Sequence, residues 1–458
     1  MDLLIKNGTI VSGGGEYCAD LAVKNGKIAA IGTALPFTAK ETVDAAGLYV
    51  LPGAVDAHTH LQMPFGGTVS ADSYETGTRA AVCGGVTTVF DYAIQRKGKG
   101  ILETVEERRA LSDPVICADL AYHCAITNLG EKSELLDEFK KAADYGVTSF
   151  KCFMVYRKEG MMIDDGMLMR IMERAGETGI LTNVHAENPD AIDARIAEFA
   201  AAGKKTPWYH YLSRPEFVEA EAVKRAIHWA RALDAKLYIV HLACAEGVEA
   251  VACAKAHGYP IFAETCPQYL EFTRDVYKRE DGRNFVCSPP IKGEESRAAL
   301  WEALARGAID TVATDHCPFK QAEKDWGKDD FTKIPNGCPG VENLYPYMLG
   351  AANSGKISFP LAVRLCAENP AKIFGCAEKG SLTPGKDADI VLYDRHKDFT
   401  ISVKNMHSGC DQTIWEGIKV KGYPVKTFLR GNLVYDNGEY VGKPGDGRYV
   451  KRGESGIL

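Results

Sequence analysis

Short apolar runs alternate with longer amphipathic segments through the middle of the chain. The runs are rich in β-branched residues and have the length of buried strands, whereas the segments between them repeat apolar residues at helical spacing. Predicted strands cover 54–60, 86–92, 115–123, 147–153, 180–186, 236–242, 259–264 and 310–315, and predicted helices include 70–82, 133–145, 166–177, 215–233, 247–257 and 295–306. Eight strands alternating with helices predict an α/β fold, a closed parallel (β/α)8 TIM barrel.

The two ends of the chain have a different pattern, with short strands separated by tight turns. Asn25-Gly26 and Asn437-Gly438 stand between apolar runs and indicate hairpins. We therefore expect a small β-sandwich domain built from both termini, residues 1–52 and 377–458, beside a barrel domain of residues 53–376. The tail from about residue 442 is rich in glycine and basic residues, and we expect it to be irregular or to form an arm on a partner.

The amino-acid composition indicates a globular protein and argues against several other classes. Hydrophobic residues make up 46% and charged residues 25% of the 458 positions, as in an ordinary globular protein. The net charge of −7 and the lack of a long basic block argue against nucleic acid and anionic membranes as partners. We expect no signal peptide and no membrane-spanning segment. The 14 cysteines are scattered without a C-x-x-C pair, which favours reduced thiols in a cytoplasmic protein.

Chemically active side chains follow five of the eight predicted strands. In TIM barrels, functional groups lie at the C-terminal ends of the strands. Each of these residues alone has an ordinary structural explanation, such as a buried histidine bonded to backbone. Their coincidence at one end of the barrel favours a functional site made of His58, His60, Lys151, His185, His241 and Asp315.

The types of side chain in this set indicate metal binding. Four neutral imidazoles and one carboxylate can hold two divalent ions, but a further ligand should bridge them. A lysine ammonium cannot bridge cations, because it only donates hydrogen bonds. Lys151 resolves the difficulty if its buried amine loses a proton and reacts with carbon dioxide to give N6-carboxylysine.

The motifs around these residues resemble the binuclear-metal amidohydrolase superfamily. They are Asp56-x-His58-x-His60, Phe150-Lys151, the stretch that begins at His185, His241 and Thr314-Asp315-His316. Within that superfamily the chain resembles the hydantoinase/dihydropyrimidinase family over essentially its whole length. The segments that carry this closer resemblance are 60–68, 264–270, 287–290, 314–319, 331–337 and 380–391.

The resemblance implies a role for each site residue. His58, His60 and Asp315 would bind one metal, His185 and His241 the other, and carbamylated Lys151 both. Zinc is favoured, and manganese, cobalt or iron stay open. No organic cofactor is expected. Tyr156 would hydrogen-bond the scissile carbonyl, Ser288 and Asn336 would hold the ring, and the substituent on the ring would be surrounded by Met63, Phe65 and Phe153.

The implied activity is that of a cyclic amidase and the implied assembly is a homotetramer. We expect hydroxide held between two metals to attack the ring amide of a 5-substituted hydantoin or dihydropyrimidine, giving an N-carbamoyl amino acid. Tyr156 would stabilise the oxyanion, and Asp315 would act as general base and then acid.

Two alternatives stay open. One is allantoinase-type activity, and the other is a non-catalytic assembly protein of the same fold. A third subclass is disfavoured, because Gln62 stands where dihydroorotase-like relatives commonly place an arginine that binds a carboxylate on the ring. Neutral rings therefore fit the sequence better.

Overall fold

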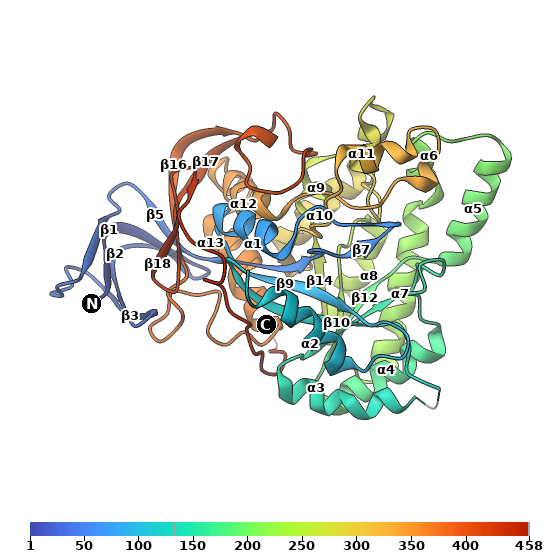
Figure 1. The fold of residues 1–458 in the computed structure, drawn as a ribbon, viewed down its shortest axis with the longest axis horizontal. Coiled ribbons are helices and arrows are strands. Elements are labelled where there is room, and N and C mark those ends of the chain that lie inside the picture. The colour runs from blue at the N-terminus through green and yellow to red at the C-terminus, as the bar shows by residue number, and fades with distance from the viewer. Residues whose placement is uncertain (132, 457–458) are drawn as a thin grey trace.

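The computed structural model describes residues 1–131 and 133–456, and its largest feature is a barrel of parallel strands (Figure 1). The strands follow one another in chain order around the sheet, so each βα unit lies beside the next. They are β6 (Ala54–Thr59), β9 (Val86–Ile94), β10 (Asp119–Ile126), β11 (Ser149–Phe153), β12 (Leu181–His185), β13 (Leu237–Ile239), β14 (Ile261–Thr265) and β15 (Thr311–Val312). The predicted (β/α)8 barrel is confirmed.

The barrel closes where its last strand meets its first. Thr59 forms a parallel bridge with His316, and the His60 amide donates to the His316 carbonyl at 2.8 Å. The Thr314 amide donates to Asp56 Oδ1 at 3.0 Å. Closure therefore brings the functional ends of β6 and β15 together, although more than 250 residues separate them in the sequence.

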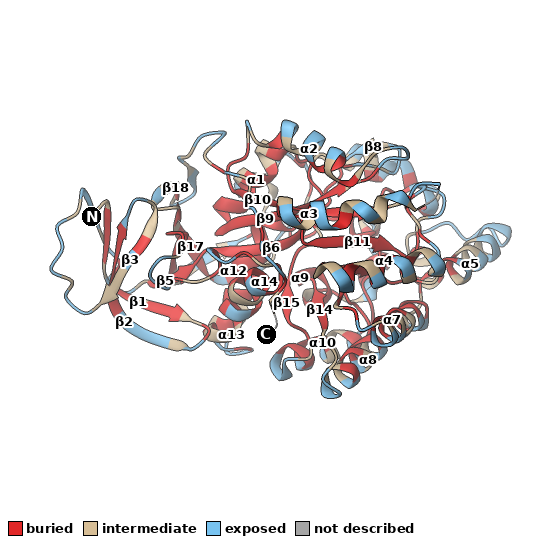
Figure 2. Cartoon of the chain, turned by 90° about the horizontal axis from the view of Figure 1, so that it is seen from below, coloured by how far each residue is buried: buried red, intermediate tan, exposed pale blue. Residues whose placement is uncertain are grey.

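Helices cover the outside of the barrel, and Figure 2 shows its strands buried beneath them. Helix α4 illustrates why they form. Asp164 caps its first turn by accepting from the Met167 amide, and Gly179 ends it in the left-handed conformation. Its buried residues Leu168, Ile171, Met172 and Ala175 recur at helical spacing.

All six predicted helices have counterparts, although 133–145 divides into a 3-10 turn, Glu134–Glu138, and α3. The helices are α1 (Tyr74–Cys83), α2 (Ile101–Ser112), α3 (Phe139–Tyr145), α4 (Asp165–Thr178), α5 (Pro189–Ala201), α6 (Trp208–Ser213), α7 (Glu216–Ala232), α8 (Ala245–Ala256), α9 (Pro267–Glu271), α10 (Glu294–Arg306), α11 (Gln321–Lys324), α12 (Leu344–Asn353), α13 (Phe359–Val363) and α14 (Asn369–Ile373). No helix among the described residues is long and apolar enough to cross a bilayer.

Two barrel strands are shorter than predicted. The runs expected to reach residues 242 and 315 leave the sheet early, at Ile239 in β13 and at Val312 in β15. Beyond these ends, His241 (φ 38°) and Asp315 (φ 52°) adopt the left-handed backbone conformation. Such strain costs about 1–3 kcal/mol per residue and persists where the surroundings impose it. The expected strand ends were wrong here because the backbone turns to direct these two side chains.

Strands from the two ends of the chain form a second, mostly antiparallel sheet beside the barrel (Figure 1). Its order is β19-β18-β17-β16-β5-β1-β2-β3, with β4 paired to β1. The bounds are β1 (Leu3–Ser12), β2 (Gly15–Lys24), β3 (Lys27–Gly32), β4 (Glu41–Asp44), β5 (Tyr49–Pro52), β16 (Ile390–Thr400), β17 (Lys419–Leu429), β18 (Asn432–Asp436) and β19 (Glu439–Tyr440).

This sheet confirms that both termini build one unit. Strand β5 joins the two ends, since it pairs with β1 on one side and with β16 on the other. The unit has an apolar core of its own, separate from that of the barrel. Both predicted hairpin turns are present, with Asn25 and Asn437 at positive φ. The domain limits at 52/53 and 376/377 stay predictions.

The C-terminal tail crosses the barrel at the start of β10. The Leu120 amide donates to the Arg448 carbonyl at 2.9 Å, and the Val450 amide donates to the Leu120 carbonyl at 2.7 Å. Arg452 is only 2% exposed and donates to Ser149 Oγ at 2.8 Å. In the described residues the tail has no helix or strand after Tyr440, in line with the irregular form expected, and it packs on its own barrel.

Candidate metal centre

One pocket at the barrel mouth brings together every site residue that the sequence predicted. The residues come from strands and loops throughout the barrel, yet all of them line a single cavity of about 40 Å³. They are His58, His60, Met63, Phe65, Lys151, Phe153, Tyr156, His185, His241, Ser288, Asp315 and Asn336.

The proposed ligands lie within reach of common metal positions. Asp315 Oδ1 is 3.1 Å from His58 Nε2 and 3.1 Å from His60 Nε2. The rings of His185 and His241 have centroids 4.4 Å apart. Ligand atoms of His58, His241 and Asp315 all lie within 4.8 Å of one another. The site thus has two histidine pairs with a carboxylate beside one of them.

The histidines carry buried nitrogen atoms that fit metal ligation. Within the described residues, His60 Nδ1 and His241 Nδ1 have no hydrogen-bond partner, and His58 Nε2 lies 3.1 Å from Asp315 Oδ1 without hydrogen-bond geometry. Leaving such an atom buried and unsatisfied costs about 1–3 kcal/mol. Burial also lowers the pKa of both His185 and His241, which keeps the imidazoles neutral. Neutral imidazole is the form that binds a metal, so the donor set fits divalent ions.

Lys151 is a buried amine with no anionic partner. The residue is 1% exposed, and its Nζ makes no hydrogen bond or ion pair with the described residues. Its Nζ lies over the ring of Tyr92, 5.0 Å from the centroid, and 5.2 Å from that of Phe153. Burial lowers the pKa of Lys151 to about 8, against the opposing effect of Asp315 and Glu264. A neutral amine is what carbamylation requires.

Glu264 contacts the His58 ring at the nitrogen that does not face Asp315. Its Oε1 lies 2.7 Å from His58 Nδ1 and accepts the His241 amide at 3.0 Å, while Tyr238 donates to its Oε2 at 2.9 Å. This contact fixes the His58 ring with Nε2 turned into the site. Sequence reasoning did not assign Glu264 a role, although it stands at the end of the seventh predicted strand.

Glu187 orients the ring of His185 through a similar contact. Its Oε2 lies 2.8 Å from His185 Nε2 and accepts from Arg214 Nη1 at 2.6 Å. Burial alone raises the pKa of Glu187, but Arg214 and His185 outweigh burial and lower it to about 2. With Nε2 engaged, His185 has Nδ1 left for a metal. Glu187 follows His185 by two residues, and that spacing was the available signal.

The left-handed turn at Asp315 is fixed by its neighbour His316. His316 Nε2 lies 3.0 Å from Asp72 Oδ2, and the Gly340 amide donates to His316 Nδ1 at 3.0 Å. Asp72 in turn accepts from the Gly409 amide at 2.6 Å. Segments from three parts of the chain therefore orient Asp315 toward His58 and His60.

Comparison with known proteins identifies the family. The model of the amidohydrolase family matches residues 49–434. A D-hydantoinase of Ralstonia pickettii is 44% identical over 99% of each chain. A D-phenylhydantoinase of Escherichia coli O1:K1 / APEC is 38% identical over 99% of this chain and 98% of the relative. The crystal structure of dihydropyrimidinase from Brevibacillus agri, 38% identical, superposes with a TM-score of 0.97 over 100% of both chains.

The chain belongs to the amidohydrolase family. Members of this family depend on a binuclear metal centre, in agreement with the donor set at the barrel mouth. The similarity to hydantoinases and dihydropyrimidinases extends over the full chain, so the resemblance noted in the sequence is confirmed.

Beside the proposed ligands, aromatic and polar side chains also line the pocket of this amidohydrolase. Tyr156 (φ 71°) packs its ring against His185 and Phe65, with centroid distances of 5.1 and 5.4 Å. Asn336 Nδ2 donates to Ser288 Oγ at 2.9 Å. The pocket also contains residues that the sequence did not single out, namely Ile94, Met161, Cys317 and Gly337.

Proposed function

We propose that the protein hydrolyses the ring amide of 5-substituted hydantoins or dihydropyrimidines and releases N-carbamoyl amino acids. It is a cyclic amide hydrolase of the hydantoinase/dihydropyrimidinase type. The convergence of four histidines, Asp315 and Lys151 in one pocket supports the proposal most directly. Relatives named D-hydantoinase and D-phenylhydantoinase support substrates of the D configuration.

The assignment of ligands is part of this proposal. His58, His60 and Asp315 would hold one ion, His185 and His241 the other, and N6-carboxylysine at position 151 would contact both. Two divalent ions, with zinc favoured, supply Lewis acidity and lower the pKa of water when bound. Glu264 and Glu187 orient His58 and His185 through the contacts described above.

Asp315 would transfer the proton during hydrolysis, and Tyr156 would stabilise the developing negative charge. Asp315 would accept the proton of the attacking water and deliver it to the ring nitrogen as the C–N bond breaks. Tyr156 would donate a hydrogen bond to the carbonyl oxygen as negative charge develops there. Burial raises the pKa of Tyr156 well above its usual value, which keeps the phenol protonated for that role. Ser288 and Asn336 would hold the ring.

A substrate panel tests this function against the alternatives. The purified protein should open D-5-phenylhydantoin and dihydrouracil, with the L enantiomer and allantoin as comparisons. Allantoin turnover above that of both rings would favour the allantoinase-type alternative. Two metal equivalents per chain with no turnover of any ring would favour the assembly protein.

Tyr156→Phe tests the proposed oxyanion contact. We expect kcat to fall by about 10²–10³-fold, the usual cost of removing one such donor, with little change in KM. A change confined to KM would contradict the role of Tyr156 in the transition state.

The homotetramer and the cytoplasmic location stay predictions. Sedimentation equilibrium of the purified chain checks the first, with four chains expected per particle.

A further inference from the structure

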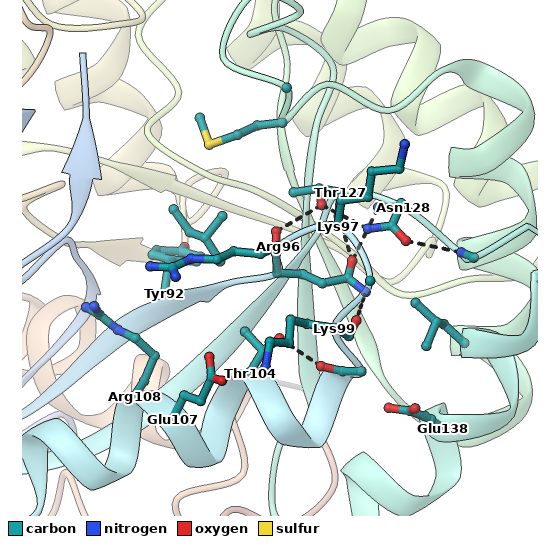
Figure 3. Close-up of a pocket in the computed structure, with 18 of the residues that line it drawn as sticks. Tyr92, Arg96, Lys97, Lys99, Thr104, Glu107, Arg108, Thr127, Asn128 and Glu138 are labelled. Carbon is teal, nitrogen blue, oxygen red and sulfur yellow. Dashed lines mark hydrogen bonds and ion pairs between the residues drawn. The ribbon is translucent and has the colours of Figure 1, made fainter. Parts of the chain in front are cut away.

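A second and larger cavity opens directly beside the metal pocket. It has a volume of about 1040 Å³ and shares Met63, Ile94 and Met161 with the metal pocket. Its other walls include the loop between β9 and α2, together with Thr127, Asn128 and Glu138 (Figure 3). The two cavities are therefore adjacent, and a substituent on a ring held in the small pocket would extend toward the larger one.

Most charged side chains on one wall of the cavity are already paired. Lys99 donates to Glu107 at 2.9 Å, and Glu138 accepts the Ile101 amide at 2.7 Å. Arg108 pairs with Asp91 at 3.0 Å. These charges have internal partners and need no ligand.

Arg96 differs from them in position and in contacts. It is exposed, and in the part of the chain that the structure describes its guanidinium makes no hydrogen bond, ion pair or ring contact, although its backbone carbonyl accepts from the Lys99 amide at 3.0 Å. Figure 3 shows its side chain extending across the cavity in the direction of Tyr92, whereas Glu138 lies at the opposite end. Tyr92 stacks on His60 with a centroid distance of 4.9 Å. Arg96 is thus a cation without a partner on the side of the cavity next to the metal ligands.

We propose that Arg96 binds an anionic group at the end of the C5 substituent, so that hydantoins with a carboxylate-bearing side chain are a preferred substrate class. The proposal rests on the cyclic amidase function above. A guanidinium recognises a carboxylate through two parallel hydrogen bonds, which gives both energy and orientation. The carboxylate lies on the exocyclic arm, so the neutral ring favoured by Gln62 is unchanged.

Paired substrates that differ only in charge test the role of Arg96. One is 5-(2-carboxyethyl)hydantoin and the other is its carboxamide, which has almost the same shape. The wild-type protein should prefer the carboxylate in kcat/KM. In Arg96→Gln, kcat/KM for the carboxylate should fall by about 10- to 100-fold, as expected for a lost charge-assisted hydrogen bond, with the carboxamide changed by no more than about twofold.

Lys97→Gln is the matched control. Lys97 belongs to the same loop and carries the same charge, but its side chain points away from Arg96 in Figure 3. Its substitution should leave the ratio of the two substrates unchanged, and Arg96→Lys should restore part of the preference. Arg96→Glu should lower kcat/KM for the carboxylate substrate further and raise kcat/KM for a hydantoin with an aminoalkyl substituent.

Two results would overturn the assignment of Arg96. One is an equal loss on both substrates in Arg96→Gln, and the other is an equal loss of preference in Lys97→Gln. Failure of the wild-type protein to open any hydantoin would instead contradict the proposed function, so the two failures are distinguishable.

Discussion

Two buried lysines in this molecule have opposite environments. Lys151 lies among the proposed metal ligands at the barrel mouth and has no anionic partner within the described residues. Lys379 lies between the barrel and the terminal sheet, where its Nζ is 2.7 Å from Asp389 Oδ2 and 2.9 Å from Asp387 Oδ2, and also contacts Asp119. Both side chains are almost fully buried, at 1% and 4% exposure.

The difference appears in their pKa values. Burial lowers the pKa of Lys151 to about 8. Burial acts in the same direction on Lys379, but Asp389, Asp119 and Asp387 outweigh it and raise the pKa. The three aspartates, whose geometry alone also suits a metal, are therefore already paired with internal cations: Lys379 contacts all three, and Lys27, Arg430 and Arg448 contact Asp387 or Asp119. At the barrel mouth, by contrast, Lys151 forms no ion pair with a described carboxylate, and this contrast is why we assign metal binding there.

Lys151→Ala should give the largest effect on activity. It removes the proposed bridging ligand, so we expect activity to fall by more than about 100-fold. Loss of a residue that only supports a ligand costs at most about 100-fold. Bound metal should fall below two per chain, and short carboxylic acids should restore part of the activity. Unimpaired activity would rule out the carbamate.

Lys379→Met should act on stability instead. It leaves three buried carboxylates without their main cation, which costs about 3–5 kcal/mol of unfolding free energy. Urea unfolding measures this loss, and kcat of the folded variant should stay close to wild type. As a control, Lys278→Met removes an exposed pair with Asp275 and should leave the unfolding free energy almost unchanged. A loss of kcat in Lys379→Met without a loss of unfolding free energy would contradict the structural role that we assign to Lys379.

Glu264→Gln should weaken metal binding without removing a ligand. Its carboxylate contacts His58 and the His241 amide, so its loss should lower metal affinity by about 10- to 100-fold. Titration with a competing chelator measures that affinity. The same substitution should leave the Lys379 cluster intact, and a large fall in unfolding free energy of the chelated protein would contradict this separation.

Asp387→Asn should give the smallest effect, a change in acid sensitivity. Burial raises the pKa of Asp387, but Lys379 and Lys27 outweigh it and lower the pKa to about 2. The stability that this carboxylate contributes is present above its unfolded pKa, about 3.9, and is lost as pH falls through about 2. The variant should therefore show a smaller drop in the urea midpoint between pH 5 and pH 2 than the wild type. An equal drop would contradict the pairing.

The barrel and the grouping of the candidate ligands at its mouth could be predicted because their signals are local. Apolar runs mark the strands, and His58, Lys151 and His185 stand directly at strand ends. The left-handed turns at His241 and Asp315 could not be predicted from the sequence. They depend on partners such as Asp72, which only the folded chain brings near. The Lys379 cluster was missed for the same reason, since Asp119 lies 260 residues away in the sequence.

Anomalous diffraction from zinc-replete crystals, recorded at the zinc absorption edge, tests the assignment most directly. Two peaks should lie among His58, His60, Lys151, His185, His241 and Asp315, about 3.5–4 Å apart as in two-metal sites, with added density on Lys151 Nζ. No peak should lie beside Lys379. An ion at Asp119, Asp387 and Asp389, or a barrel mouth without zinc, would contradict the account.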